Sequence, residues 1–146
     1  MVVRKMTEAD LAEVTKIEFD SFAEPWSEKD FQNSLKDNNN EYLVAEIDGQ
    51  VIGYCGYWGI AGEGDIFNVA VRKENRGQKT GYLMLCELIK LAKSRGIASL
   101  TLEVRSSNES AIRLYHSLGF EQTAIRKDFY TKPKEDAVIM WLYGIQ

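Results

Sequence analysis

An Asp-Gly dipeptide between two long apolar segments constrains the fold of this chain more than any other feature. Residues 42–47 (YLVAEI) and 50–58 (QVIGYCGYW) are rich in β-branched and aromatic side chains, and Asp48-Gly49 is all that separates them. Asp-Gly favours a type I′ turn, because both central residues of that turn have a positive φ. The pattern therefore predicts an antiparallel hairpin over residues 42–58.

Hydrophobic periodicity and capping residues predict further strands and helices on both sides of this hairpin. Thr7-Glu8-Ala9-Asp10 has the spacing of a capping box, and Ser27 is a typical N-cap, so a helix is expected to begin at each. Apolar residues recur at helical spacing over residues 81–95, and a short helix is expected over 109–118. The other expected strands are residues 2–4, 65–71, 99–104, 122–130 and 136–143. The order β-α-α-β-β-β-α-β-α-β-β indicates an α/β protein, and 146 residues fit one domain, 1–146.

Composition argues against several classes of protein. A single histidine, His116, leaves no set of imidazoles for a metal site and argues against a histidine-based triad. Cys55 and Cys86 lie too far apart in sequence for paired metal ligands, and two cysteines make no disulfide framework. A net charge of −4 argues against nucleic-acid binding through bulk charge. With no signal-type start and no membrane-length apolar run, a cytoplasmic protein is expected.

A glycine-bearing turn between a strand and a helix is the first candidate binding site. Residues 69–82 read VAVRKENRGQKTGY. Such a turn can direct several backbone N–H groups at one anion, assisted by the positive end of the helix dipole. Arg76 and Lys79 add positive charge, but the segment matches neither a Walker loop nor GxGxxG. An ordinary strand-to-helix connection explains the segment equally well.

A carboxylate and a phenol are the candidate catalytic groups. Alternation along residues 99–104 places Glu103 and Arg105 on the face opposite the apolar side chains. In a half-buried cleft desolvation would suit Glu103 to general-base catalysis, whereas a surface Glu103 paired with Arg105 is the alternative. Tyr115 lies on the apolar stripe of the next helix, where core packing competes with proton donation. Asn108 suits the N-cap of that helix, which competes with any binding role.

Aromatic and acidic residues in two further segments form a third candidate site. Trp26, expected in a loop, and Tyr130, expected at the end of a strand, are bulky aromatic residues that can form the lip of a substrate site. The carboxylates of Glu135 and Asp136 can hold a cation. Packing and solvation explain each of these residues equally well when it is taken alone.

Together these segments resemble the GNAT superfamily of N-acetyltransferases, and within it the ribosomal-protein-alanine N-acetyltransferase (RimI) type. The resemblance runs over nearly the whole chain. It is carried by Pro25-Trp26-Ser27, residues 67–71, the turn from Arg76 to Gly81, Leu102-Glu103-Val104-Arg105, Ser107-Asn108, Ala111, Leu114-Tyr115, Leu118-Gly119-Phe120, Arg126, Tyr130 and Glu135-Asp136-Ala137.

The resemblance implies a GNAT fold, with a mixed, mostly antiparallel twisted sheet of about seven strands and helices on both faces. Two central parallel strands, residues 65–71 and 99–104, are expected to splay apart around acetyl-CoA, the co-substrate. By resemblance, Glu103 is the general base and Tyr115 the general acid. The expected coenzyme contacts are Val69, Ala70, Val71, Gly77, Gln78, Lys79, Thr80, Gly81, Tyr82 and Asn108, and the expected acceptor contacts are Trp26 and Tyr130.

The expected activity is transfer of an acetyl group from acetyl-CoA to a protein N-terminal amine, without a metal, nucleic acid or membrane. The expected acceptor is the N-terminal alanine of a ribosomal protein. An acetyltransferase for other protein termini or a small amine is one alternative. A non-catalytic acyl-CoA-binding module is another, and the presence of both Glu103 and Tyr115 argues against it.

Lys79 departs from the superfamily turn, which usually reads Arg/Gln-x-x-Gly-x-Gly/Ala. Lysine stands where the first glycine is expected. We expect Lys79 to adopt ordinary αR geometry, to leave the backbone donors in place and to pair with a coenzyme phosphate.

Overall fold

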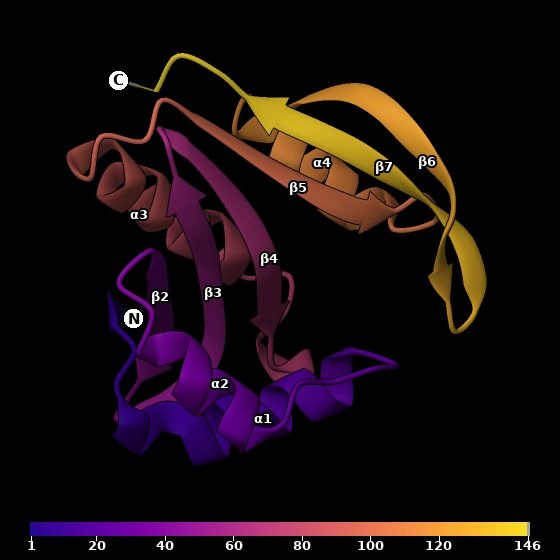
Figure 1. Cartoon of the computed structure of the whole chain (residues 1–146). Coiled ribbons are helices and arrows are strands. Elements are labelled where there is room, and N and C mark those ends of the chain that lie inside the picture. Colours follow the sequence, from indigo (N-terminus) through magenta and orange to yellow (C-terminus); the bar gives the residue numbers. More distant parts are fainter. Residues whose placement is uncertain (146) are drawn as a thin grey trace.

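A single mixed sheet forms the centre of the protein in the computed structural model, which describes residues 1–145. Its strands are β1 (Val2–Lys5), β2 (Asn40–Ile47), β3 (Gln50–Ile60), β4 (Glu63–Val71), β5 (Ser99–Arg105), β6 (Glu121–Thr131) and β7 (Lys134–Leu142). They lie in the order β1-β2-β3-β4-β5-β7-β6, and only β4 and β5 are parallel neighbours (Figure 1). The predicted mixed, mostly antiparallel sheet is confirmed. Gln146, the last residue of the expected domain, lies outside the described residues.

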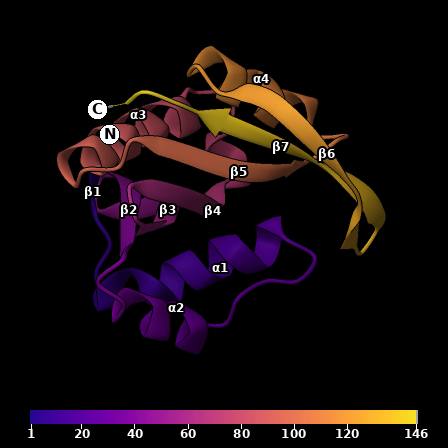
Figure 2. The ribbon, with the colours of Figure 1, turned by 45° about the horizontal axis from the view of Figure 1, so that its top comes forward.

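Helices cover both faces of this sheet, as predicted. They are the 3-10 turns η1 (Glu8–Asp10) and η2 (Lys73–Asn75) and the helices α1 (Leu11–Ser21), α2 (Glu28–Leu35), α3 (Thr80–Ser94) and α4 (Glu109–Ser117). Figure 2 shows α1 and α2 on one face and α3 and α4 on the other. None of the helices in residues 1–145 combines the length and hydrophobicity that a bilayer crossing requires.

Local sequence signals explain where several of these elements begin. Asp48 and Gly49 have φ angles of 51° and 79°, which agrees with the predicted type I′ turn between β2 and β3. The Thr7 N–H donates to the Asp10 carboxylate at 2.8 Å, and the Ser27 hydroxyl accepts from the Asp30 N–H at 3.2 Å. Both predicted helix starts are therefore confirmed.

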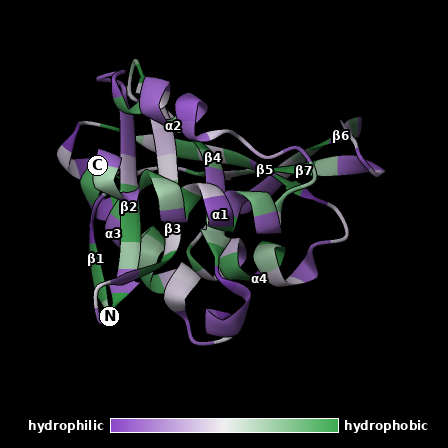
Figure 3. Cartoon of the chain, turned by 90° about the horizontal axis from the view of Figure 1, so that it is seen from below, coloured by the Kyte–Doolittle hydropathy of each residue, from purple (hydrophilic) through white to green (hydrophobic). Residues whose placement is uncertain are grey.

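Each face of the sheet has its own hydrophobic core. On one face, Met84 and Leu88 of α3 are fully buried, and on the other Val14 of α1 and Phe31 of α2 are fully buried. Because both faces of β3 are covered, its residues 51–57 are buried without alternation. In Figure 3, α2 is predominantly hydrophilic, in agreement with Phe31 as its one buried residue.

The two parallel strands separate soon after they begin to pair. β4 and β5 are paired at Glu63↔Ser99, Gly64↔Leu100 and Asp65↔Thr101 and no further along the described chain. A bulge then shifts the register of β4 against β3, between Ile66 and Asn68. Figure 1 shows β4 and β5 diverging beyond this point, while β5 continues along β7. The predicted splayed pair is confirmed.

Two predicted boundaries differ from the observed ones in a way that matters for the site. β6 extends to Thr131 and β7 begins at Lys134. Tyr130 therefore lies inside β6, as the expected strand 122–130 allows, whereas Glu135 lies in β7 and not in a loop as expected. The two residues are paired with each other across the β6–β7 hairpin. The turn residues of the hairpin are confined to 132–133, because pairing continues almost to its tip.

Candidate active site

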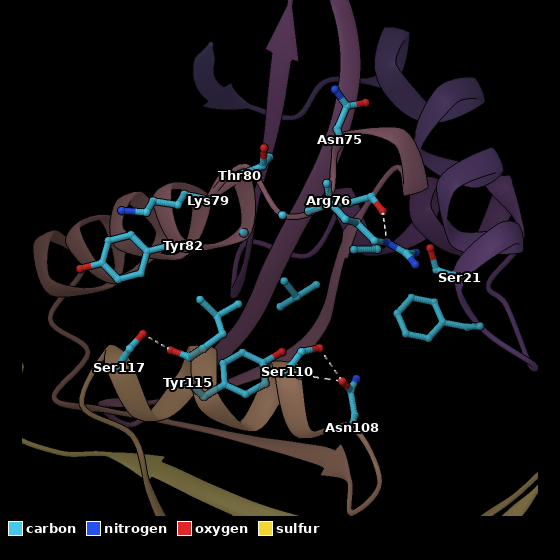
Figure 4. A pocket seen from close by; sticks show the side chains of 18 residues that line it. Ser21, Asn75, Arg76, Lys79, Thr80, Tyr82, Asn108, Ser110, Tyr115 and Ser117 are labelled. Carbon is cyan, nitrogen blue, oxygen red and sulfur yellow. Dashed lines mark hydrogen bonds between the residues drawn. The ribbon is translucent and has the colours of Figure 1, made fainter.

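A cavity of about 800 Å³ lies where β4 has separated from β5 (Figure 4). It is bordered by the end of β4, the turn into α3 and one side of α4. The predicted coenzyme residues that line it are Val69, Ala70, Val71, Gly77, Lys79, Thr80, Gly81, Tyr82 and Asn108. Gln78 belongs to the same turn but does not line this first cavity.

The end of β4 presents to the first cavity a backbone edge that no strand covers, on which the Val71 carbonyl accepts from Arg76 Nε at 3.0 Å. Val69, Ala70 and Val71 are paired with β3 on one side. On the other side, pairing with β5 has already ended at Asp65. Unpaired backbone N–H and C=O groups of a strand edge can bind the amides of an extended ligand. The pantetheine chain of acetyl-CoA has amides of this kind.

The turn into α3 has a geometry that corrects one expectation from the sequence. Lys79 has φ 63° and ψ 16°, so it adopts the left-handed conformation and not the expected αR geometry. Gly77 in the same turn has φ 77°. The chain must reverse here so that the first N–H groups of α3 face the first cavity, and these groups are unsatisfied within the helix. The usual glycine at position 79 is explained, because only glycine adopts this conformation without strain.

A second cavity, of about 570 Å³, adjoins the first across the junction of β4, β5 and α4. Val69, Asn108, Ala111 and Tyr115 line both cavities. The second cavity also brings together Glu18 of α1, Phe22 just after that helix, Trp26, Asn68, Glu103, Arg105 and Tyr130. The predicted catalytic and acceptor residues therefore share one cavity, although they come from segments far apart in the sequence.

Glu103 lies half-buried on the β5 side of the second cavity. The alternative pairing with Arg105 is not observed, because the Arg105 guanidinium binds Glu135 at 3.2 Å. A second carboxyl lies nearby on β4: burial, together with the charge of Glu103, raises the pKa of Asp65 to about 6. The Oδ1 atom of Asp65 is buried and has no hydrogen-bond partner among residues 1–145.

Tyr115 lies at the junction of the two cavities and is 8% exposed. Its ring packs against Phe120 with centroids 5.9 Å apart, so the predicted packing role is real. Burial also raises the pKa of the Tyr115 phenol above its ordinary value, so the hydroxyl keeps its proton at neutral pH. Packing and proton donation are therefore compatible in one residue.

Asn108 caps α4 from the edge of both cavities. Its Oδ1 accepts hydrogen bonds from the Ala111 N–H at 3.2 Å and the Ser110 hydroxyl at 3.3 Å (Figure 4). The predicted N-cap is confirmed. Since the cap uses Oδ1, the amide nitrogen of Asn108 is the group left for a ligand.

The two predicted acceptor residues border the second cavity and are held by aromatic contacts. The Trp26 ring stacks on Phe67, with centroids 5.7 Å apart. The guanidinium of Arg105 lies 4.2 Å from the centroid of the Tyr130 ring, a cation–π contact. Burial raises the pKa of Tyr130, with a further contribution from the charge of Glu103.

Glu135 and Asp136 line neither cavity, which corrects their interpretation as a cation site. Glu135 accepts a hydrogen bond from the Ser107 N–H at 2.6 Å, and its contacts with Ser107 lower its pKa to about 2. Asp136 accepts from the Asp128 N–H at 2.9 Å. These carboxylates hold the loop after β5 and the β6–β7 hairpin, and their binding capacity is used by the protein itself.

α1 and the residue that follows it contribute to the site, which the sequence did not predict. Ser21 and Phe22 line both cavities, and Glu18 and Asn68 line the second. One signal was available for Glu18, because it lies on the same helical stripe as Leu11 and Val14, where an acidic residue is unusual.

Comparisons with known proteins agree with this geometry. Residues 11–120 match the acetyltransferase (GNAT) family. The chain is 40% identical over 141 residues to a Bacillus subtilis (strain 168) protein provisionally named [ribosomal protein bS18]-alanine N-acetyltransferase, which covers 96% of this chain and 93% of that protein. It resembles the crystal structure of the ribosomal-protein-S18-alanine N-acetyltransferase from Escherichia coli, with a TM-score of 0.89, 35% identity and coverage of 97% and 92%.

A structure that contains the co-substrate is also similar. An acetyltransferase from Salmonella typhimurium with its cofactor acetyl-CoA has a TM-score of 0.86 and 25% identity, with coverage of 98% of this chain and 93% of that one. The family match, the near-complete coverage of these relatives and the splayed strands with their adjoining cavities support one conclusion. The chain belongs to the GNAT family and is an acetyl-CoA-dependent N-acetyltransferase.

Proposed function

We propose that this acetyltransferase, as one domain over residues 1–146, modifies the N-terminal alanine of a ribosomal protein in the cytoplasm. The observation that carries the proposal is the second cavity, which is open to an acceptor and has Glu103 on one side and Tyr115 at its junction with the first. The names of the Bacillus subtilis and Escherichia coli relatives support this acceptor.

In the proposed reaction, Glu103 accepts the proton that the acceptor must lose. An N-terminal ammonium has a pKa of about 8, so most of it is protonated and cannot attack a thioester at neutral pH. Once the amine is neutral, its nitrogen attacks the thioester carbonyl carbon and forms the C–N bond. The C–S bond then breaks, and the nitrogen releases its second proton, which replaces the proton that Tyr115 gives up. The Tyr115 hydroxyl donates a proton to the leaving thiolate, a role that the position of Tyr115 at the junction of the two cavities supports.

The proposed coenzyme contacts divide into two groups with different chemistry. The edge of β4 that no strand covers, at Val69–Val71, suits the amides of pantetheine, and the N–H groups of the turn and of the first residues of α3 suit the pyrophosphate. We retain Gln78 and Asn108 in this proposal. Gln78 contributes through its backbone, because its side chain is exposed and lines neither cavity.

Two experiments test the proposed acceptor. Intact-protein mass spectra of ribosomal proteins, from cells with and without this protein, should differ by the mass of one acetyl group on one ribosomal protein. With purified protein, an alanine-terminated peptide should release free CoA faster than peptides with other termini or a polyamine does. Preference for another terminus or for a polyamine would identify the alternative acetyltransferase. If no CoA is released with any of these acceptors, the protein is better explained as a non-catalytic acyl-CoA-binding module.

A further inference from the structure

Glu18 carries a carboxyl group from the apolar face of α1 into the protein interior. It is 2% exposed. Its carboxylate accepts hydrogen bonds from the Tyr54 hydroxyl of β3, from Nδ2 of Asn68 on β4 at 3.2 Å and from the backbone N–H of Trp26 at 3.0 Å. A single side chain thus connects α1, two strands of the sheet and the segment between α1 and α2.

Burying the Glu18 carboxylate costs free energy, and an apolar side chain at this position would avoid that cost. Burial raises the pKa of Glu18, and the hydrogen bonds from Tyr54 and Trp26 offset this in part. An apolar residue at position 18 would extend the apolar stripe of α1 without that cost, provided that the Tyr54 and Asn68 donors were also replaced and the backbone N–H of Trp26 found another acceptor. What an apolar residue cannot do is set the positions of three hydrogen-bond donors at once.

Two of those donors belong to residues that border the second cavity. Trp26 and Asn68 both line it, and so does Glu18 itself, whereas none of the three lines the first cavity. Asn68 follows Phe67 in the β4 bulge, and the Trp26 ring stacks on Phe67. Glu18 therefore ties both sides of this aromatic contact to α1.

We propose that Glu18 is a positioning residue for the acceptor: the reach of its side chain holds Trp26 and the β4 bulge in the arrangement that the acceptor binds. The inference rests on the proposed function, because it assumes that the second cavity receives the acceptor amine. Glu18 sets the affinity for the acceptor and leaves that for acetyl-CoA unchanged.

Two substitutions separate the reach of the side chain from its charge. Glu18→Gln keeps the reach: its Oε1 can accept from Trp26, its Nε2 can donate to the Tyr54 hydroxyl, and the Asn68 amide can turn over to present its oxygen. Glu18→Asp keeps the charge but is one methylene shorter, so its carboxylate withdraws from the Trp26 N–H.

Glu13 provides a matched control on the same helix. Its carboxylate also accepts from a backbone N–H of a strand, that of Val51 at 2.9 Å, but Glu13 lines neither cavity. Glu13→Asp shortens the side chain by the same amount at the other end of α1. A loss of acceptor binding through general loosening of α1 would appear in this variant as well.

The experiment measures the KM of an alanine-terminated peptide and, separately, the Kd of acetyl-CoA by calorimetry without peptide. We expect Glu18→Asp to raise the peptide KM about fivefold, the scale of one lost hydrogen bond. Glu18→Gln and Glu13→Asp should stay within about twofold, and acetyl-CoA Kd should not change in any variant. If Glu18→Asp does not fold, Tyr54→Phe, which removes one donor outside both cavities, should give the same selective but smaller rise.

Several results would overturn the proposal. A larger effect of Glu18→Gln than of Glu18→Asp would assign the role to charge. Glu18 would have only a general structural role if Glu18→Asp changed the peptide KM and the acetyl-CoA Kd equally. The same would hold if Glu13→Asp raised the peptide KM as much as Glu18→Asp does. Unchanged peptide KM in Glu18→Asp would remove the role altogether. If the wild-type protein does not acetylate the alanine peptide, the proposed function fails first, and the same variants are compared on the amine that it does acetylate.

Discussion

Replacing Lys79 by glycine should give a more stable protein than replacing it by alanine. Lys79 has φ 63° and ψ 16° at the N-cap of α3, and its carbonyl accepts the first helical hydrogen bond from the Leu83 N–H at 3.0 Å. The left-handed conformation is therefore built into the start of the helix. A residue with a β-carbon is strained there, and glycine is not.

The expected magnitude follows from two opposing effects. A left-handed L-residue costs about 1–2 kcal/mol, whereas glycine loses about 0.4–1 kcal/mol more than alanine through the entropy of the unfolded chain. Lys79→Gly should therefore be more stable than Lys79→Ala by about 1 kcal/mol, which corresponds to roughly 2–4 °C in Tm for a chain of this size. Alanine is the matched control, because both variants lack the ammonium group and only alanine keeps the β-carbon.

Thermal and urea unfolding of both variants without ligand measure this difference, and calorimetry measures acetyl-CoA binding. Both variants should lose less than about tenfold in acetyl-CoA affinity, because an exposed ion pair contributes roughly 0.2–1 kcal/mol. A glycine variant no more stable than the alanine variant would refute the left-handed conformation in solution. A gain of about a hundredfold in affinity in the glycine variant alone would show that the lysine side chain obstructs the turn.

Three further substitutions test the site. Glu103→Gln should lower turnover at pH 7 about 10²-fold or more and leave the Kd of acetyl-CoA unchanged. If this variant keeps the turnover of the wild-type protein across roughly pH 6 to 9, Glu103 is not the base. Tyr115→Phe should lower kcat while the Tm stays near the wild-type value, because the ring that packs on Phe120 is kept; a normal kcat would leave Tyr115 only its packing role. Asp65 has a folded-state pKa of about 6 and an ordinary value of 3.8, so the folded state binds the proton more tightly and stability falls as the pH rises from about 4 to 6. Asp65→Asn should remove this loss. The full shift corresponds to about 3 kcal/mol, and solvent screening at this half-buried side chain reduces it, so the free energy of urea unfolding should rise by about 1–2 kcal/mol at pH 8 and stay unchanged at pH 4. An equal effect at both pH values would contradict the assignment.

Much of the fold could be predicted because it depends on contacts between residues close in sequence. The Asp48-Gly49 turn, the Ser27 cap and the periodicity of α3 are each determined within a few residues, and the structure agrees with all three. The side of β5 on which Glu103 lies also follows from the sequence, since strand alternation allows only two faces. The splayed pair of strands was expected from the family resemblance and not from periodicity.

Tertiary structure decided those properties that depend on partners far away in the chain. Glu135 was interpreted as a free carboxylate, but β-sheet pairing brings Arg105 and Ser107 to it from β5 and the following loop. Lys79 was expected in αR geometry, yet the path from β4 into α3 requires a positive φ there. No local rule predicts either outcome, because the sequence specifies the donors and acceptors while the packing of distant strands specifies which of them meet.

Glu18 shows the limit most clearly. The sequence determined that an acidic residue would lie on the buried stripe of α1, since the helical period leaves it no other face. Only the packing of α1 on β3 and β4 decided that Tyr54, Asn68 and Trp26 would surround that carboxylate. A buried carboxylate is stable only where such donors converge, and convergence is a property of the folded chain as a whole.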